Sequence, residues 1–287
     1  MLAKILSIAS SPAESAIRPA RATTCRWRGV RKSLGRERPP QQNRRVPDAI
    51  FEDPRLAQVY DPLDPDRSDL DVYLDIAVEL GATSVLDVGC GTGTFSCMLA
   101  RLGIEVTAVD PARASLDVAR GKPGADRVTW ILGDATTLPP REVDAAFMTA
   151  NVAQVFLTDD AWASTLHGIW QALRPGGALV FETRDPARRA WEEWTRERTW
   201  TSVDVPEAGV VESWEELVEV VGPQVTFRSM TAFTRDDLVI ESTSTLRFRD
   251  CAEVEESLVR QGLELVELRD APDRPGRELV FLCRRPR

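Results

Sequence analysis

Apolar segments alternate with amphipathic ones along most of the chain beyond residue 46. Five short runs rich in Val, Ile, Leu and Ala predict buried strands, at residues 84–88, 105–110, 128–132, 143–150 and 178–183. Between several of them the apolar residues have helical spacing, at residues 93–102, 112–120 and 160–173. Strands that alternate with helices in this way predict an α/β fold with a parallel sheet.

Two further helices are predicted from their caps. Ser68 precedes an apolar stripe of helical spacing and is a suitable N-cap for it. Asp185 followed by Pro186 is a good N-cap and first helical position. The helix that we expect there would carry Trp191 and Trp194 on one face.

The pattern changes after residue 199. Residues 199–248 contain short β-rich runs separated by turn signals, which predict an antiparallel meander. We therefore expect an inserted substrate or cap region at about 190–248. Helical spacing within it leaves a helix as the alternative, at Trp214, Leu217, Val218 and Val221. After a capped helix from Asp250, two strands at 263–268 and 278–283 are joined by a link too short for a crossover, so the last strand should run antiparallel.

Charge divides the 287-residue chain near residue 46. Residues 1–46 hold 11 Lys or Arg against 2 acidic residues and lack periodicity, which predicts a disordered basic tail. A targeting peptide and a basic arm for nucleic acid are the alternatives. Residues 47–287, the expected folded domain, hold 25 basic and 43 acidic residues. This acidic body makes nucleic acid an unlikely substrate.

Composition narrows the class of protein further. The chain is 43% hydrophobic, enough for a core, but has no apolar run near the roughly 20 residues of a membrane span. Its five cysteines are scattered and include no Cys-x-x-Cys pair, which indicates neither a disulfide framework nor a metal site. We expect a protein of the cytoplasm, where thiols stay reduced.

Residues 85–95 read VLDVGCGTGTF, an apolar strand that turns through three glycines into a helix. Such a loop brings the backbone close to a ligand at a helix N-terminus. Asp110, at the end of the next strand, lies 21 residues after Gly89, where a carboxylate can bind ribose hydroxyls. A dinucleotide site would need glycine at Thr94, and a P-loop would need a following Gly-Lys-Ser/Thr, so both are disfavoured.

The glycine loop belongs to a set of four motifs that resembles the class I S-adenosylmethionine-dependent methyltransferases. These are Asp87-Val88-Gly89-Cys90-Gly91-Thr92-Gly93, the acid Asp110, Gly133-Asp134-Ala135 and Leu173-Arg174-Pro175-Gly176-Gly177, in the family's order. The resemblance implies a Rossmann-like seven-stranded sheet of order 3-2-1-4-5-7-6 with strand 7 antiparallel. The meander would then be inserted between strands 5 and 6.

The same resemblance implies a binding site for S-adenosylmethionine. Gly89, Gly91 and Gly93 would lie under the methionine moiety, Asp87 near its amino group, Asp110 at the ribose and Asp134 at the adenine amino group, with Ala135 and Asn151 lining the pocket and Tyr60 closing over the cofactor. A tight turn in an inactive Rossmann-like fold is the alternative for the glycines. For Asp87 or Asp134 alone, a helix cap or a solvated strand end is the alternative.

The acceptor is expected to be a small molecule. Residues 151–156 follow strand four without the Asn/Asp-Pro-Pro-aromatic motif of enzymes that methylate bases. Candidate substrate residues near the strand ends are Phe156, Arg184 and Trp191. Arg184 is equally a candidate for a salt bridge with Glu182 or Asp185, and Trp191 for packing against the meander.

No catalytic base is assigned, because the single histidine, His167, falls at the flank of its helix and is expected at the surface. The alternatives for the whole chain are methylation of protein or RNA, and a non-catalytic cofactor-binding regulatory module. The oligomeric state is left open.

Overall fold

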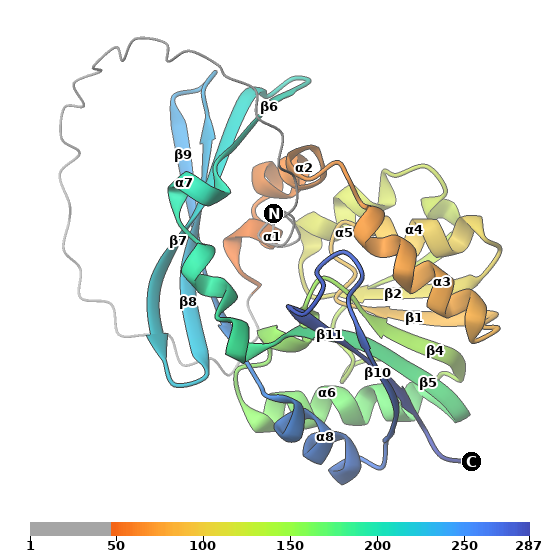
Figure 1. Cartoon of the computed structure of the whole chain (residues 1–287). Helices are drawn as coiled ribbons and strands as arrows, with labels where there is room; N and C mark the ends of the chain where they lie inside the picture. Colours follow the sequence, from red (N-terminus) through yellow and green to blue (C-terminus); the bar gives the residue numbers. More distant parts are fainter. Residues whose placement is uncertain (1–46) are drawn as a thin grey trace.

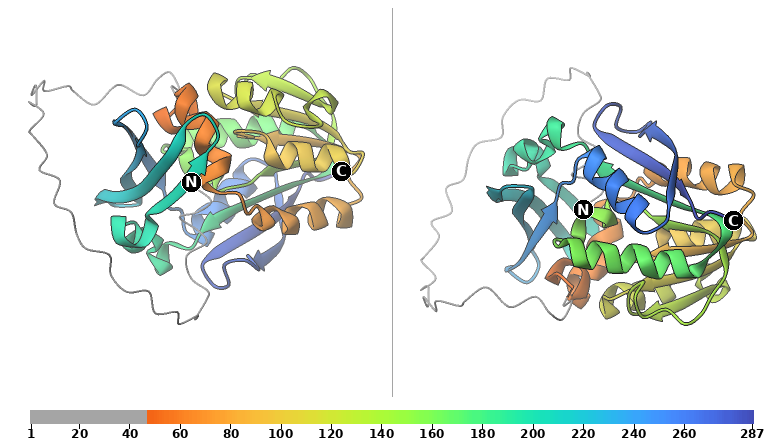
Figure 2. Two further views of the ribbon diagram at one scale, coloured as in Figure 1. Left: turned by 90° about the horizontal axis from the view of Figure 1, so that it is seen from above. Right: turned by 90° about the horizontal axis from the view of Figure 1, so that it is seen from below.

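Two β-sheets form the body of the protein in the computed structural model, which describes residues 47–287 (Figure 1). The predicted basic tail at 1–46 lies outside the described residues. The larger sheet has seven strands with helices on both faces, and the smaller sheet has four strands. The smaller sheet stands beside the larger one and is joined to it through short helices (Figures 1 and 2).

The seven-stranded sheet has the predicted order. Its strands are β1 (Ser84–Val88), β2 (Glu105–Asp110), β3 (Val128–Leu132), β4 (Val143–Met148), β5 (Leu173–Arg184), β10 (Glu264–Asp270) and β11 (Glu278–Arg284). They are arranged β3-β2-β1-β4-β5-β11-β10, and β11 is antiparallel to both of its neighbours. The order 3-2-1-4-5-7-6 and the antiparallel last strand are therefore confirmed.

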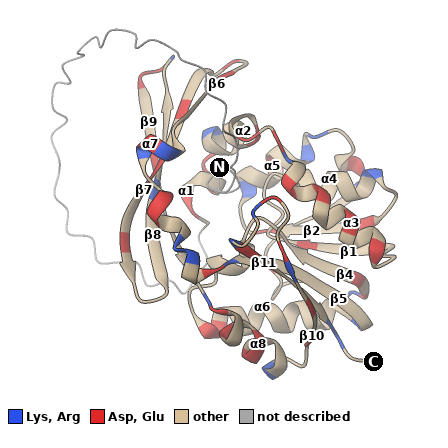
Figure 3. Cartoon of the chain, viewed as in Figure 1, with Lys and Arg blue, Asp and Glu red and all other residues tan. Residues whose placement is uncertain are grey.

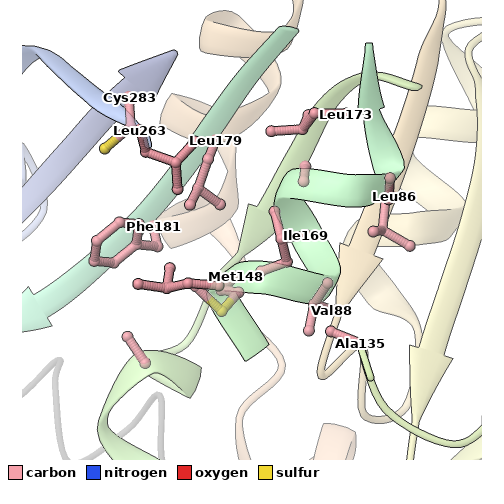
Figure 4. Packing of buried hydrophobic residues seen from close by; sticks show 14 of the residues in the cluster. Leu86, Val88, Ala135, Met148, Ile169, Leu173, Leu179, Phe181, Leu263 and Cys283 are labelled. Carbon is pink, nitrogen blue, oxygen red and sulfur yellow. The ribbon is translucent and has the colours of Figure 1, made fainter. Parts of the chain in front are cut away.

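Helices cover the two faces of this sheet with separate apolar clusters. They are α3 (Asp71–Glu79), α4 (Thr94–Arg101), α5 (Arg113–Arg120), α6 (Asp159–Ala172) and α8 (Cys251–Arg260). On one face α6 and α8 pack over the central strands, where Ile169 lies near Met148 and Val88 (Figure 4). On the other face α3 and α4 bury Ile76 and Leu99. This burial holds the carboxyl ends of β1, β2 and β4 at one edge, next to the glycine loop.

The inserted segment is an antiparallel sheet, as predicted. Its strands are β6 (Thr201–Val205), β7 (Gly209–Val221), β8 (Gln224–Phe233) and β9 (Leu238–Arg247), and all of its pairs are antiparallel. In β8 every second side chain is buried, the period of a strand with one covered face. The helical alternative for residues 214–221 is excluded, because that segment pairs with β8 along its length.

Short helices and loops connect the inserted sheet to the larger one. The helices α1 (Ala49–Glu52) and α2 (Pro54–Leu63) lie between them, and the Ile50 N–H donates to Ser242 Oγ at 2.8 Å. Arg249 Nη2 donates to the Phe156 carbonyl at 2.7 Å. The buried indole of Trp194 contacts the ring of Phe227, with centroids 4.7 Å apart. The two sheets thus hold each other through side-chain and backbone contacts.

Two of the predicted helix starts are wrong. The helix expected after Asp185 is replaced by two 3₁₀ turns, Pro186–Arg188 and Ala190–Glu193, because Arg189 between them is left-handed with φ 48°. Asp185 still caps the first turn by accepting from the Ala187 N–H. Ser68 does not cap α3, since the Asp66 carboxylate accepts from the Ser68 N–H and begins a separate 3₁₀ turn before α3.

Candidate active site

The glycine loop joins β1 to α4 through three left-handed residues. Gly89, Gly91 and Gly93 have φ of 74°, 52° and 76°, which favour glycine. A Cβ on Gly89 would lie 2.7 Å from the Val152 side chain, and one on Gly93 would overlap the Trp130 ring. A Cβ on Gly91 would meet no atom within 4 Å. The outer glycines are therefore required by packing, whereas Gly91 faces open space.

Asp110 holds the glycine loop in place from the end of β2. Its Oδ2 accepts from the Gly91 N–H and its Oδ1 accepts from the Ala112 N–H, each at 2.8 Å. The carboxyl is buried, and this burial raises its pKa to about 6 against the opposing effect of the two backbone N–H groups. Each oxygen has a further lone pair, so the group can still accept bonds from a ligand.

Asp87 is a second buried carboxyl, on β1 immediately before the loop. Its Oδ2 accepts from Ser96 Oγ at 2.5 Å, and its Oδ1 has no hydrogen-bond partner among residues 47–287. Burial raises the pKa of Asp87 to about 7. A buried oxygen without a partner is costly, so this atom is a candidate for binding a ligand cation.

The carboxyl end of α2 is held against the glycine loop by charged and polar contacts. Asp61 Oδ1 accepts from Thr92 Oγ1 at 2.7 Å, and Asp61 Oδ2 forms an ion pair with Lys122 Nζ at 2.7 Å. Lys122 also donates to Thr94 Oγ1 at 2.7 Å. Tyr60, next to Asp61, is half-buried, and burial raises the pKa of its hydroxyl. The structure thus places Asp61, the neighbour of Tyr60 in sequence, in contact with the glycine loop.

Replacement of Asp61 by asparagine is expected to loosen α2, because the ion pair to Lys122 is lost. Hydrogen exchange of the α2 backbone amides should become about fivefold faster, as for a contact worth about 1 kcal/mol. The matched control is Asp117→Asn, which removes an exposed ion pair with Arg120 on α5 and should leave α2 unchanged. Equal exchange in Asp61→Asn and the unaltered chain would contradict this role.

The loop after β3 contains the predicted residues Asp134 and Ala135. Asp134 Oδ1 accepts from the Thr136 N–H at 2.8 Å, and Asp134 is half-buried. Ala135 is buried under α6, where a Cβ on Gly168 would overlap the Ala135 carbonyl oxygen. The position of this loop therefore depends on the absence of a side chain at Gly168.

Asn151 begins a group of buried polar side chains at the ends of β4 and β5. It is left-handed with φ 59°, and its N–H donates to Glu182 Oε1 at 2.9 Å. Its Nδ2 lies 3.3 Å from Glu278 Oε1 on β11. We call the group the strand-end cluster; its members are Asn151, Gln154, Glu182, Arg184, Arg274 and Glu278.

Arg184 does not form the salt bridge with Glu182 or Asp185 that was considered from the sequence. Its Nη1 donates to Gln154 Oε1 at 2.8 Å and its Nε lies 3.5 Å from Glu278 Oε1, whereas Glu182 and Asp185 bond other groups. Burial lowers its pKa to about 10. Several buried atoms of the strand-end cluster have no hydrogen-bond partner in the described part of the chain: Arg184 Nη2, Gln154 Nε2, Asn151 Oδ1 and Glu182 Oε2. The cluster is therefore able to bind a polar ligand.

The remaining aromatic and histidine candidates make contacts of their own. Trp191 packs edge-on against Phe248 after the inserted sheet, with centroids 4.7 Å apart. The ring of Phe156 packs on Trp162 of α6, at 5.7 Å. His167 is exposed and bonds Gln171 on the same helix, in agreement with its predicted surface position. The packing alternative thus describes the contact of Trp191.

A family comparison agrees with this arrangement. Residues 85–177, from the start of the glycine loop strand to the turn inside β5, match the model of the methyltransferase domain family. The matched segment is similar to the class I S-adenosylmethionine-dependent methyltransferases. The matched segment contains the glycine loop, Asp110, Asp134 and Asn151, which are the positions that the motifs singled out.

Curated methyltransferases share part of this chain. The cypemycin N-terminal methyltransferase of a Streptomyces species is 37% identical over 109 residues, which are 38% of this chain and 44% of that protein. The malonyl-acyl-carrier-protein O-methyltransferase of Serratia marcescens is 32% identical over 180 residues, 61% of each chain. The alignments with the first three relatives span less than half of their length.

Solved methyltransferases share the fold over a longer range. A structure of an S-adenosylmethionine-dependent methyltransferase from Clostridium acetobutylicum has a TM-score of 0.67 at 17% identity and covers 81% of this chain and 98% of its own. A sugar N-methyltransferase from a Streptoalloteichus species has a TM-score of 0.66 at 19% identity and covers 88% and 100%. At these identities the likeness concerns the fold alone.

Other features of this protein lie away from the glycine loop. A polar pocket at the amino ends of β1 and β2, lined by Ser84, Glu105, Thr107 and Arg141 among others, is at the opposite edge of the sheet. No helix in residues 47–287 is long and apolar enough to cross a membrane. Within the same range no three His, Cys, Asp or Glu side chains are grouped as metal ligands.

Asp61, Lys122 and Glu278 shape the site but were not found from the sequence. Asp61 and Lys122 lie 61 residues apart, and Arg184 and Glu278 are separated by the inserted sheet. No local spacing connects either pair. The only signal is the position of Asp61 beside Tyr60, which is a predicted cofactor residue.

Proposed function

We propose that this chain transfers a methyl group from S-adenosylmethionine to a small-molecule acceptor. The observation that carries the proposal is the glycine loop, since Gly91 faces open space beside two buried carboxyls, Asp87 and Asp110. The unpartnered Oδ1 of Asp87 suits an ammonium group, and the free lone pairs of Asp110 suit hydroxyl donors. The residues present therefore fit the cofactor.

The other cofactor contacts are proposed by the family resemblance. Asp134 would bind the adenine amino group, Ala135 and Asn151 would line the pocket, and Tyr60 would cover it. S-adenosylmethionine supplies an electrophilic sulfonium methyl group when bound. The protein then has to hold the acceptor atom in line with that methyl group and to exclude water. The contacts of Asp61 that hold α2 on the glycine loop suit the second task.

The acceptor is proposed to bind between the strand ends and the inserted sheet. Arg184 lies there with an unpartnered Nη2, and its guanidinium carbon is 5.7 Å from the ring of Trp194. Phe156 and Trp191 are proposed to line this region on opposite sides. The insertion of a whole sheet at the ligand-binding edge is typical of a segment that determines specificity.

Relatives and charge favour a small acceptor over a nucleic acid. The solved structures include a sugar N-methyltransferase, and the curated relatives include a methyltransferase of malonyl-acyl-carrier protein. Acidic side chains outnumber basic ones on α3 and α8, as Figure 3 shows, which disfavours a phosphate backbone. The four cysteines of the described residues are free thiols, in keeping with the cytoplasmic location that we propose.

The experiment that tests the function supplies methyl-labelled S-adenosylmethionine and the protein to a cell extract. We expect label in the small-molecule fraction, and we expect calorimetry to detect S-adenosylhomocysteine but not NAD. Label found only in protein or RNA would show that the acceptor is a macromolecule and not a small molecule. Binding of S-adenosylhomocysteine without any transfer would favour a regulatory module, and binding of NAD alone would refute the cofactor.

The pKa of Asp87 predicts how cofactor binding depends on pH. At pH 6 a carboxyl with a pKa of about 7 carries a proton, and it must lose this proton to bind an ammonium group. At pH 8 it is already ionised, so S-adenosylhomocysteine should bind about tenfold more tightly than at pH 6. Calorimetry at the two pH values measures this ratio. The Asp87→Asn variant should bind S-adenosylhomocysteine weakly at both pH values. If its affinity still changed between the two pH values as much as that of the unaltered chain, the assignment to Asp87 would be contradicted.

A further inference from the structure

The inner face of the inserted sheet, which faces α1 and α2, changes from apolar to polar and back to apolar. At one end Val211 and Phe233 pack on α1 and α2, and at the other Val225 and Phe227 pack near Trp194. Between them lies a band of buried polar side chains, which we call the inner polar band: Ser213, Glu215, Ser229, Thr231 and Ser242. A sheet face used only for packing would be apolar throughout.

Glu215 is the charged member of the inner polar band. Its Oε2 accepts from Ser229 Oγ at 2.6 Å, and its backbone N–H donates to Thr199 Oγ1 at 2.8 Å. Its Oε1 has no hydrogen-bond partner in residues 47–287, and no Lys or Arg of that range forms an ion pair with it. With 2% of its surface exposed, the carboxylate would be a buried charge without compensation.

Three hydroxyl groups of the inner polar band have partners. Ser213 Oγ donates to the Met230 carbonyl, Ser229 Oγ to Glu215, and Ser242 Oγ accepts from Ile50. Among the atoms of the inner polar band, Glu215 Oε1 is the buried one that lacks a hydrogen-bond partner in the described residues. A neutral hydroxyl ligand could be bound by serine or threonine, whereas a buried carboxylate is matched by a cation.

Buried polar atoms without hydrogen-bond partners occur both at Glu215 and in the strand-end cluster. Trp194 lies between them, because its ring contacts Arg184 on one side and Phe227 of the inner face on the other. Trp194 Nε1 is buried without a hydrogen-bond partner among the described residues, like Arg184 Nη2 and Glu215 Oε1. A ligand at the strand ends would thus meet hydrogen-bond donors on the core side and a carboxylate on the side of the inserted sheet.

We propose that Glu215 binds a protonated amino group of the methyl acceptor, so that the acceptor is a cationic amine. This inference rests on the proposed function and names the substrate class. Burial raises the pKa of Glu215 to about 8, which lets an incoming ammonium group stabilise the ionised form. Ser229 and Thr199, its hydrogen-bonded neighbours in the described chain, do not titrate near neutral pH. Acceptor binding should therefore strengthen as the pH rises toward 8.

The test uses the full chain, methyl-labelled S-adenosylmethionine and a protein-free cell extract in two portions. One portion is untreated, and the primary and secondary amines of the other are acetylated with an amine-selective reagent, which removes their charge. The variants are Glu215→Gln and the matched control Glu216→Gln. Glu216 directly follows Glu215 in β7 and lies on the opposite face, where it bonds Trp214 and Arg228.

We expect the unaltered chain and Glu216→Gln to label the untreated extract, with the label retained on a cation exchanger, and to lose this label with the acetylated extract. Labelling by Glu215→Gln should fall about 10- to 100-fold, as for a lost charge-assisted hydrogen bond, while its S-adenosylhomocysteine affinity stays unchanged. In Glu215→Gln the KM for the acceptor should no longer fall as the pH rises toward 8. A mere loosening of the sheet would not remove this pH dependence.

Equal labelling of both extract portions, or full labelling by Glu215→Gln, would overturn the inference while leaving the methyltransferase function intact. Failure of the proposed function gives a different result: no labelling of either portion by any variant, or no binding of S-adenosylhomocysteine.

Discussion

Replacement of Gly168 by alanine is expected to lower the free energy of unfolding by about 3 kcal/mol. Gly168 lies in the middle of α6, where alanine would ordinarily stabilise a helix by about 1 kcal/mol. Here the new Cβ would overlap the carbonyl oxygen of Ala135 and lie 2.7 Å from its carbonyl carbon. These are backbone atoms of a buried loop, so the helix or the loop has to move.

Urea unfolding of the Gly168→Ala variant and of the unaltered chain measures this loss of stability. The control is Gly121→Ala at the end of α5, where the nearest atom to the new Cβ is 3.4 Å away, and its stability should change by less than about 0.5 kcal/mol. Because the displaced loop contains Asp134, the Gly168→Ala variant should also bind S-adenosylhomocysteine more weakly. A variant as stable as the unaltered chain would show that α6 does not rest on this loop.

The Asp110→Ala variant should lose about 1.5–3 kcal/mol of cofactor affinity, roughly 10- to 150-fold. Two effects act in the same direction. The hydrogen bonds proposed from Asp110 to the ribose hydroxyls are removed, and the Gly91 and Ala112 N–H groups lose the acceptor that fixes the glycine loop. Calorimetry with S-adenosylhomocysteine measures the change, and Glu105→Ala at the exposed start of the same strand is the control.

A double-mutant cycle separates the two effects of Asp110. Adenosine and 2′,3′-dideoxyadenosine are compared in the unaltered chain and in Asp110→Ala. If the carboxylate binds the ribose, removal of the hydroxyls should cost affinity only where Asp110 is present. Additive losses would assign Asp110 to the loop alone, and an unchanged affinity for S-adenosylhomocysteine would remove it from the site.

Local patterns predicted the main sheet and the position of the glycine loop. Each strand is a short apolar run, and the motifs at Gly89–Gly93, Asp110 and Gly133–Ala135 are contiguous in sequence, so their places in the fold follow from the topology. The link at residues 269–277 was short enough to predict the antiparallel β11. These features depend on neighbours along the chain.

The features that the sequence did not reveal depend on distant partners. The helix expected at Trp191 and Trp194 is absent, because Trp194 is buried against Phe227 of the inserted sheet and Trp191 packs on Phe248 after it, so that the indoles need no helical face. Glu215 was not singled out, since alternation along β7 shows that two faces exist but not which one is covered. Both facts follow from the placement of the inserted sheet.

The pairing of β11 with β5 has a consequence for the order in which the protein assembles. Arg184 at the end of β5 pairs with Glu278 at the start of β11, so all four strands of the inserted sheet lie in the loop that this pairing closes. During synthesis β5 is an open sheet edge, and Arg184 has no carboxylate on β11, until β11 leaves the ribosome. The strand-end cluster is thus assembled last, and acceptor recognition should arise after the glycine loop has formed.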